Sequence, residues 1–164
     1  MMKYFAYGSN MSILRLQERV PSAKRLDTVT LKNHQLRFNM SGTDGSGKCD
    51  SFQTNNIEDT VIGALFEINR AEKTILDRAE SLGYGYDEKI VSVQNDLGEV
   101  FNALIYCAIN IDDSLKPYSW YLNHVIIGAK ESNLPTDYLA VIESIVCLED
   151  PDKTQDAEQR AMYS

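Results

Sequence analysis

The period of the apolar positions changes repeatedly along this chain, and the changes predict short strands mixed with short helices. Residues 2–7 form an almost uninterrupted apolar and aromatic run, which is typical of a strand buried on both faces. Further strands are expected at residues 26–31, 35–40, 61–68, 86–93 and 99–109. Helices are expected at residues 12–19, 69–80, 118–130 and 136–147.

The segments between these elements indicate how the strands are connected. Residues 95–98 (NDLG) predict a hairpin turn between the last two strands, and the Gly- and Ser-rich residues 41–48 predict a loop. Gly63, inside a predicted strand, indicates a bulge or a close backbone approach. Several strands follow one another directly, unlike the regular alternation of a doubly wound fold. The expected fold class is therefore α+β, with a mixed or mostly antiparallel sheet curled on itself.

The length of the chain suits one domain, which we expect to span residues 1–148. Residues 149–164 are polar and acidic, so we expect a frayed or loosely docked C-terminal tail. No apolar run approaches the roughly 20 residues that cross a bilayer, and the N-terminus lacks the features of a signal peptide. A cytoplasmic protein without a membrane partner is the expectation.

Charge and cysteine content narrow the partners further. The formal net charge is −8, which argues against nucleic acid as a partner but allows a local positive site for a small carboxylate. The three cysteines are an odd number without metal-like spacing, so we expect reduced thiols and no metal. Cys107 and Cys147 lie in apolar runs and are expected in the core, whereas Cys49 is expected to be exposed in a loop.

The end of the first predicted strand is a candidate ligand site. The strand stops at Gly8, and Ser9, Asn10 and Ser12 are good helix N-cap residues. A strand, a glycine turn and a helix start can point free backbone N–H groups at an anion. An ordinary turn without a ligand explains this local pattern equally well.

Glu80 is the candidate for proton-transfer chemistry. It follows Leu76 by four positions and so continues the predicted apolar stripe of its helix, which also includes Ile75. Desolvation there, with Tyr84 and Tyr86 as an aromatic wall, would raise the carboxyl pKa toward the range of a general base. From the pattern alone, a glutamate that turns to solvent at the helix end is the simpler interpretation. His34 and His124 are weak candidates, and no nucleophile motif is present.

Four segments, in this order, make the chain resemble the γ-glutamylcyclotransferases. They are residues 4–11 (YFAYGSNM), 61–66 (VIGALF), 76–80 (LDRAE) and 128–131 (GAKE), the last followed by Leu134, Pro135 and Tyr138. Taken without the resemblance, residues 128–131 look like an ordinary helix end. The segments span most of the chain, and the last is more specific to members that act on γ-glutamyl amino acids.

The resemblance implies a small closed β-barrel surrounded by helices. It implies cleavage of a γ-glutamyl amide into 5-oxoproline and a free amine, usually an amino acid, without metal or cofactor. By the same resemblance, Glu80 matches the catalytic acid/base, Tyr121 a substrate-contacting tyrosine and Tyr106 a pocket tyrosine. The residues that match the substrate-binding loop are Tyr4, Phe5, Ala6, Tyr7, Gly8, Ser9 and Asn10.

The chain departs from the family pattern after Glu80, where Ser81 stands in place of the usual glycine. Tyr86 is our choice for the tyrosine that follows in the family. This departure leaves the acceptor open, so a cyclotransferase acting on a γ-glutamyl amine or a biosynthetic γ-glutamyl intermediate is one alternative. A non-catalytic γ-glutamyl-binding module is another. The oligomeric state is also open, with a homodimer as one option.

Overall fold

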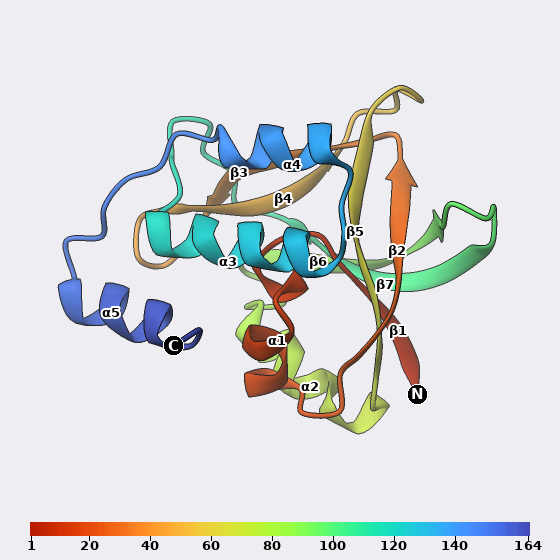
Figure 1. Cartoon of the computed structure of the whole chain (residues 1–164), viewed down its shortest axis with the longest axis horizontal. Helices are drawn as coiled ribbons and strands as arrows, with labels where there is room; N and C mark the ends of the chain where they lie inside the picture. The colour runs from red at the N-terminus through yellow and green to blue at the C-terminus, as the bar shows by residue number, and fades with distance from the viewer.

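Five strands close into a barrel in the computed structural model of this chain, which describes residues 1–164. Around the barrel the order is β1 (Met2–Ala6), β5 (Thr60–Ile68), β2 (Lys24–Lys32), β6 (Tyr86–Gln94) and β7 (Val100–Ala108). Neighbouring strands are antiparallel, except that β7 returns parallel to β1 and closes the barrel. The prediction of a small mixed barrel in an α+β fold is confirmed (Figure 1).

Two glycines in the barrel show how the strands are fitted together. A Cβ on Gly63 would lie 2.3 Å from the carbonyl oxygen of Ala6, so the close backbone approach predicted there is confirmed. The irregularity in strand pairing lies instead in β2, between Arg25 and Asp27. Gly98 has φ of +83° in the turn between β6 and β7, as the predicted hairpin requires.

A separate two-stranded sheet, β3 (His34–Ser41) and β4 (Gly47–Gln53), packs against the barrel. The sequence pattern did not predict β4 and assigned its first two residues to a loop, which is wrong. Cys49 lies in β4 and is only 2% exposed, so the expectation of an exposed thiol is also wrong. His34 opens β3, one residue before the strand expected at residues 35–40. Because β4 buries Asp50 and Ser51, its strand pattern was hidden by polar residues.

Helices cover the barrel and connect its strands. Helices α3 (Ser119–Glu131) and α4 (Thr136–Glu143) lie side by side in Figure 1, and α3 packs against the 3₁₀ turn η1 (Ser9–Met11) that precedes α1 (Ile13–Arg19). The helix expected at residues 69–80 is a 3₁₀ turn, η2 (Arg70–Glu72), followed by α2 (Lys73–Ala79). Only Leu76 of α2 is fully buried, and Ile75 is 46% exposed, so most of the predicted stripe faces outward.

The C-terminal segment contains a docked helix, α5 (Lys153–Ala161), so of the two expectations, a frayed tail or a loosely docked one, the frayed tail is wrong. No residue of α5 is fully buried, and the contacts that hold the segment are polar. The Trp120 indole N–H donates to Asp150 at 2.9 Å, and the Tyr163 hydroxyl bonds to Ser12 and His124. Apolar periodicity in the sequence does not reveal a helix that is held by polar contacts.

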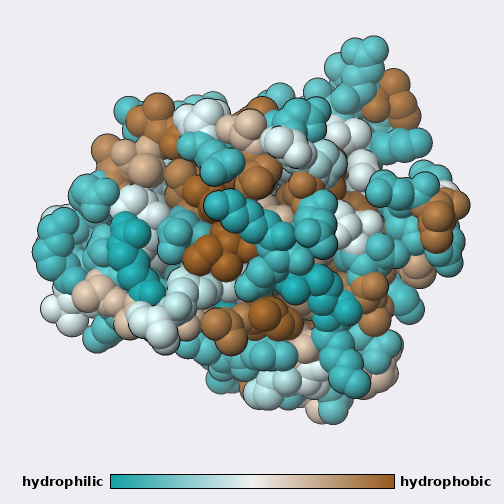
Figure 2. Space-filling model, in the orientation of Figure 1, coloured by the Kyte–Doolittle hydropathy of each residue, from teal (hydrophilic) through white to brown (hydrophobic).

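The hydrophobic core fills the barrel and the space beneath α3. Its largest fully buried side chains include Phe5, Leu65, Phe66 and Ile105. Cys107 and Cys147, which were expected in the core, are only half-buried at its edge. On the face shown in Figure 2, hydrophobic residues lie in small groups among hydrophilic ones. None of the helices has the length and apolar character that a bilayer crossing requires.

Candidate active site

The loop after β1 is held close to β4 and forms one wall of a cavity. Gly8 has φ of −118°, so it does not use the left-handed conformation that glycine permits. Glycine is required there because a Cβ would lie 2.8 Å from the Cβ of Cys49 and 3.1 Å from its Sγ. Strand β4 therefore occupies the space that a side chain at position 8 would need, and the loop backbone packs directly against this strand.

The segment at residues 128–131 supports this loop from the other side. A Cβ on Gly128 would lie 2.5 Å from the Cβ of Met11 and from the backbone nitrogen of Ser12, so only glycine lets α3 approach η1 this closely. The Glu131 carboxylate accepts the N–H of Ile13 at 3.1 Å and bonds to Arg25 at 3.2 Å. These residues look like an ordinary helix end in sequence, yet they anchor the start of α1.

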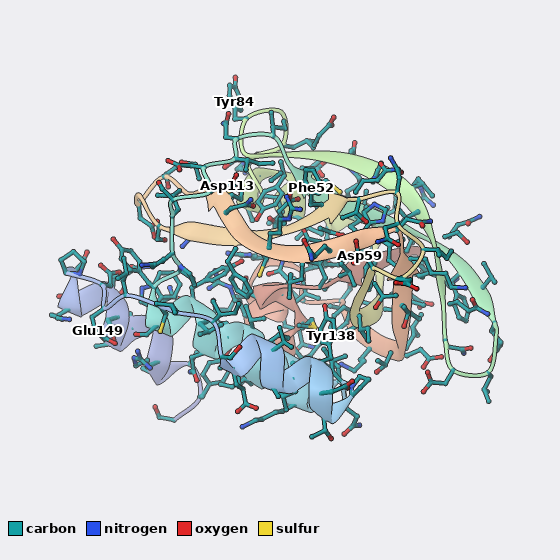
Figure 3. All side chains as sticks on the ribbon, turned by 90° about the horizontal axis from the view of Figure 1, so that it is seen from above. Phe52, Asp59, Tyr84, Asp113, Tyr138 and Glu149 are labelled. Carbon is teal, nitrogen blue, oxygen red and sulfur yellow. The ribbon has the colours of Figure 1, made fainter.

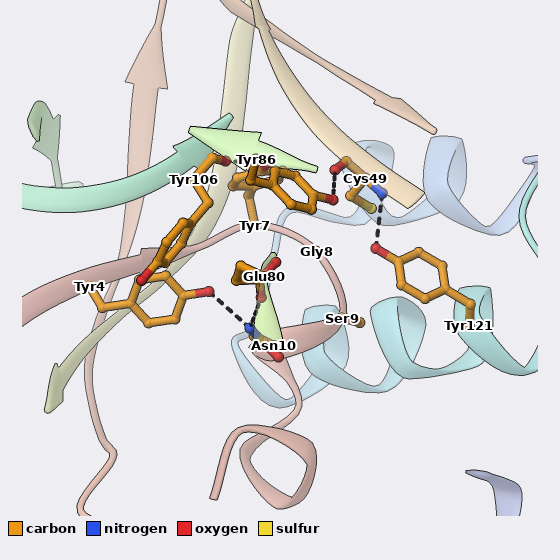
Figure 4. A pocket seen from close by; sticks show the side chains of 10 residues that line it. All are labelled: Tyr4, Tyr7, Gly8, Ser9, Asn10, Cys49, Glu80, Tyr86, Tyr106 and Tyr121. Carbon is orange, nitrogen blue, oxygen red and sulfur yellow. Dashed lines mark hydrogen bonds between the residues drawn. The ribbon is translucent and has the colours of Figure 1, made fainter. Parts of the chain in front are cut away.

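The cavity has about 290 Å³ of space not occupied by atoms, part of which is open to solvent (Figure 4). Its walls come from β1, the loop that follows, β4, β6, β7, α3 and the C-terminal end of α2. Two of the predicted loop residues, Phe5 and Ala6, do not line it because they are buried in the barrel core. The lining residues are Tyr4, Tyr7, Gly8, Ser9, Asn10, Cys49, Glu80, Tyr86, Tyr106 and Tyr121.

Glu80 ends α2 and turns its carboxylate into the cavity, with 15% of the side chain exposed. One oxygen, Oε1, accepts a hydrogen bond from Asn10 Nδ2 at 2.7 Å and lies 3.8 Å from Arg19 Nη1. The other oxygen has no hydrogen-bond partner in the protein. Burial raises the pKa of this carboxyl above 4.5, against the opposing effects of Arg19 and Asn10. The interpretation of Glu80 as a solvent-facing helix end is therefore wrong.

Asn10 holds the polar end of the cavity together. Its Nδ2 donates to Glu80 and also to the Tyr4 hydroxyl oxygen at 3.1 Å, while its Oδ1 accepts from Arg19 at 2.8 Å. These bonds fix which way the amide faces. The Tyr4 hydroxyl is an acceptor in this arrangement and donates its own proton to no group of the protein, so it can donate to a ligand.

The tyrosines on the opposite wall are held by backbone groups. The hydroxyl of Tyr86 donates to the carbonyl of Cys49, and the Cys49 N–H donates to the Tyr121 hydroxyl oxygen at 2.9 Å. The Tyr7 hydroxyl donates to the carbonyl of Tyr106 at 2.5 Å. Burial raises the pKa of Tyr7, Tyr86 and Tyr121 well above the usual value, so these phenols stay neutral.

Tyr106 contributes its ring and not its hydroxyl. The hydroxyl donates to Asp77 at 2.6 Å, away from the cavity, while the ring meets that of Tyr4 edge-on at 5.9 Å. Tyr84, expected in the aromatic wall beside Tyr86, is 79% exposed and points outward from the loop before β6 (Figure 3). The predicted wall therefore keeps Tyr86 but loses Tyr84.

The cavity opens into a second, wider space of about 810 Å³, which we call the outer chamber. The two share Ser9, Glu80, Tyr86 and Tyr121, so we call the first cavity the inner chamber. The charged residues that line the outer chamber are Arg15, Arg19, Lys48 and Glu80.

Sequence reasoning missed all three of these cations. The spacing of Arg15 and Arg19, four positions apart on the helix after the candidate loop, places them on one helix face and could have indicated their role. Nothing in the sequence around Lys48 signals its position. No three His, Cys, Asp or Glu side chains gather in an arrangement able to hold a metal ion.

Comparison with known proteins identifies relatives over most of the chain. A model of the AIG2-like family matches residues 60–142. The γ-glutamylcyclotransferases of Bos taurus and Homo sapiens are each 30% identical over 148 residues, which cover 87% of this chain and 77% of the relative.

Solved structures agree with the sequence matches. The structure of a γ-glutamyl cyclotransferase is similar with a TM-score of 0.86 at 25% identity, covering 97% of this chain and 98% of that one. An uncharacterized protein from Homo sapiens gives a TM-score of 0.89 at 26% identity, covering 99% and 98%. Sequence identity, the family model and the shared fold together establish that this chain belongs to the AIG2-like γ-glutamylcyclotransferase family.

Proposed function

We propose that the protein is a γ-glutamylcyclotransferase, which converts a γ-glutamyl amino acid into 5-oxoproline and a free amino acid. The observation that carries the proposal is the Glu80 carboxylate, buried at the junction of the two chambers with one oxygen held by Asn10 and the other free. Membership of the family supports the reaction class.

The reaction needs no nucleophile from the protein. The α-amine of the γ-glutamyl group attacks its own γ-carbonyl carbon, the new C–N bond closes a five-membered ring, and the bond to the acceptor nitrogen breaks. Cys49, the thiol in the cavity, is unsuited to attack because burial raises its pKa to about 12 and keeps it protonated. The cavity thus fits a reaction in which the substrate supplies the nucleophile.

Glu80 is proposed to move the proton. The free oxygen takes a proton from the attacking amine and returns it to the leaving nitrogen, so one carboxyl serves first as base and then as acid. A carboxyl with a raised pKa suits both steps better than an ordinary one, because it gives up and regains a proton closer to neutral pH. Such proton transfer typically contributes about 10²–10⁴-fold to the rate.

Holding the glutamyl chain in its folded form is proposed as the other large contribution. The inner chamber is small, and its tyrosine rings leave little room for an extended chain. The N–H of Gly8 donates to no group of the protein, and neither does the Tyr4 hydroxyl. These two donors are proposed to hold the α-carboxylate of the substrate or the oxyanion that forms at its γ-carbonyl.

The test is Glu80→Gln, which keeps the side-chain shape and removes the base. We expect release of 5-oxoproline from a γ-glutamyl dipeptide to fall about 10²–10⁴-fold, because the proton transfer is lost. Glu58→Gln, at an exposed loop position, is the matched control and should retain full activity. Near wild-type release by Glu80→Gln would show that the role of Glu80 is wrong. No release by the wild type from any γ-glutamyl amino acid would refute the reaction class.

A further inference from the structure

The outer chamber is positive although the protein is acidic. Its wall carries Arg15, Arg19 and Lys48 against the single carboxylate of Glu80, whereas the whole chain has a formal net charge of −8. A local reversal of sign in a partly enclosed space attracts an anionic group of a ligand. The inner chamber has no such cations.

Arg15 is a buried cation without a counter-charge. Arg15 is only 9% exposed, and its guanidinium forms no ion pair with any carboxylate. Nε donates to the Ser9 hydroxyl at 3.1 Å, and Nη1 donates to the Gln159 side-chain oxygen at 2.9 Å. Both partners are neutral, and burial lowers the Arg15 pKa to about 10. A buried guanidinium paired only with neutral groups is costly unless an anion joins it.

Lys48 provides a second cation on the same wall. Its Nζ lies 4.7 Å from the ring centres of Trp120 and Tyr121, and the guanidinium carbon of Arg15 lies 5.9 Å from the same Trp120 ring. Asp44, at 3.1 Å from Nζ, offsets part of its charge. Arg19 differs from both because it is already engaged with Glu80 and Asn10. Lys48 also bonds to the Ser46 hydroxyl at 3.0 Å, but unlike Arg19 it has no bond to the proposed base, so Arg15 and Lys48 are the cations left for a ligand.

We propose that Arg15 and Lys48 form a subsite for the α-carboxylate of the released amino acid, and that this subsite sets the preference for γ-glutamyl dipeptides over γ-glutamyl amines. The proposal rests on the proposed function. Glu80 belongs to both chambers, so a scissile amide placed at Glu80 puts the glutamyl part in the inner chamber and the acceptor in the outer one.

The test compares two substrates that differ only in the acceptor carboxylate, γ-glutamyl-alanine and γ-glutamyl-alaninamide. We expect the wild type to show a kcat/KM at least about tenfold higher for the dipeptide, as a charge-assisted contact provides. Lys48→Met keeps the aliphatic stem and should lower this ratio several-fold, mainly through KM for the dipeptide. Asp44→Asn, which removes the counter-charge of Lys48, should raise the ratio. Lys24→Met, at an exposed position on β2, is the control and should leave it unchanged.

The outcomes separate this proposal from the proposed function. A wild-type ratio near one, or a ratio that Lys48→Met does not change, overturns the subsite while 5-oxoproline is still released. An equal loss on both substrates in Lys48→Met also overturns it, because the cations would then hold the glutamyl carboxylate. If the wild type releases 5-oxoproline from neither substrate and from no other γ-glutamyl amino acid, both proposals fail.

Discussion

The inner and outer chambers meet at Glu80 and differ in how their walls are built. The inner wall consists largely of tyrosines whose hydroxyls are held by backbone or side-chain groups of the strands and the loop, so its shape is fixed. The outer wall is formed by α1, residues 40–43, Lys48 of β4, and residues 79–81 and 84–86, and its distinguishing feature is positive charge. In the proposed reaction, one end of the ligand would be selected by shape and neutral hydrogen bonds, and the other end by charge.

After the loss expected for Glu80→Gln, the largest effect should come from filling the inner chamber. Gly8→Ala forces the loop away from Cys49, because the new Cβ would lie 2.8 Å from the Cβ of Cys49. Overpacking of this kind costs about 1–3 kcal/mol, which corresponds to about a 5- to 160-fold loss of kcat/KM if it falls on the bound geometry. Steady-state kinetics on a γ-glutamyl dipeptide measures it.

Gly85→Ala is the matched substitution in the outer chamber. Its nearest contact would be the Ser81 Cβ at 3.5 Å, an ordinary van der Waals distance, so its kcat/KM should stay within a few-fold of the wild type. Equal losses at Gly8 and Gly85 would contradict the idea that only the inner chamber depends on exact shape.

A smaller effect is expected at the boundary between the chambers, where Arg19 lies beside Glu80. The positive charge of Arg19 lowers the Glu80 pKa, opposing the increase caused by burial. Arg19→Gln should therefore raise that pKa further and move the acid limb of the kcat/KM pH profile to higher pH. The substitution should change kcat/KM less at pH values above the acid limb than at pH values below it. A limb that stays in place, or that moves as much in the exposed Arg70→Gln control, would count against Glu80 as the titrating base.

The smallest effect on activity at neutral pH should come from replacing His124, which belongs to a polar network behind the outer wall. His124 is fully buried and bonds to Gln159 at 2.8 Å and to Tyr163, and burial lowers its pKa from 6.5 to about 4. The unfolded chain therefore binds a proton near pH 6.5 that the folded chain does not bind until about pH 4. This part of the stability is present above pH 6.5 and is lost as the pH falls toward 4.

Urea unfolding at several pH values measures this loss, which amounts to about 3 kcal/mol at most, since one pKa unit corresponds to about 1.4 kcal/mol. His124→Asn should unfold with less pH dependence between pH 6.5 and 4 than the wild type. His34→Asn is the comparison variant: burial lowers the pKa of His34 as well, so this variant shows how much of the pH dependence comes from His34. If the free energies of unfolding of the wild type and of His124→Asn change with pH in parallel, His124 does not titrate in this way.

The contrast between the strands and the C-terminal segment shows which parts of the fold a pattern can predict. β1, β5, β6 and β7 were predicted nearly to their ends because their inward residues are apolar. β4 and α5 were missed because polar groups make their contacts, as with Asp50 in β4, which accepts the Ala108 N–H at 2.8 Å. Hydrogen bonds between distant segments leave no periodic trace in the sequence.

The sequence by itself determined the positions of the five barrel strands, the glycine loop at Gly8 and the choice of Glu80 as a candidate, because local backbone preferences and motif residues lie in neighbouring positions. Only the tertiary structure decided that Arg15 and Lys48 line one chamber, that Phe5 leaves the site for the core, and that the C-terminal helix supports α1. The reason is physical: charge and burial at a site depend on which distant segments pack together, and a residue's neighbours in space are not its neighbours in the chain.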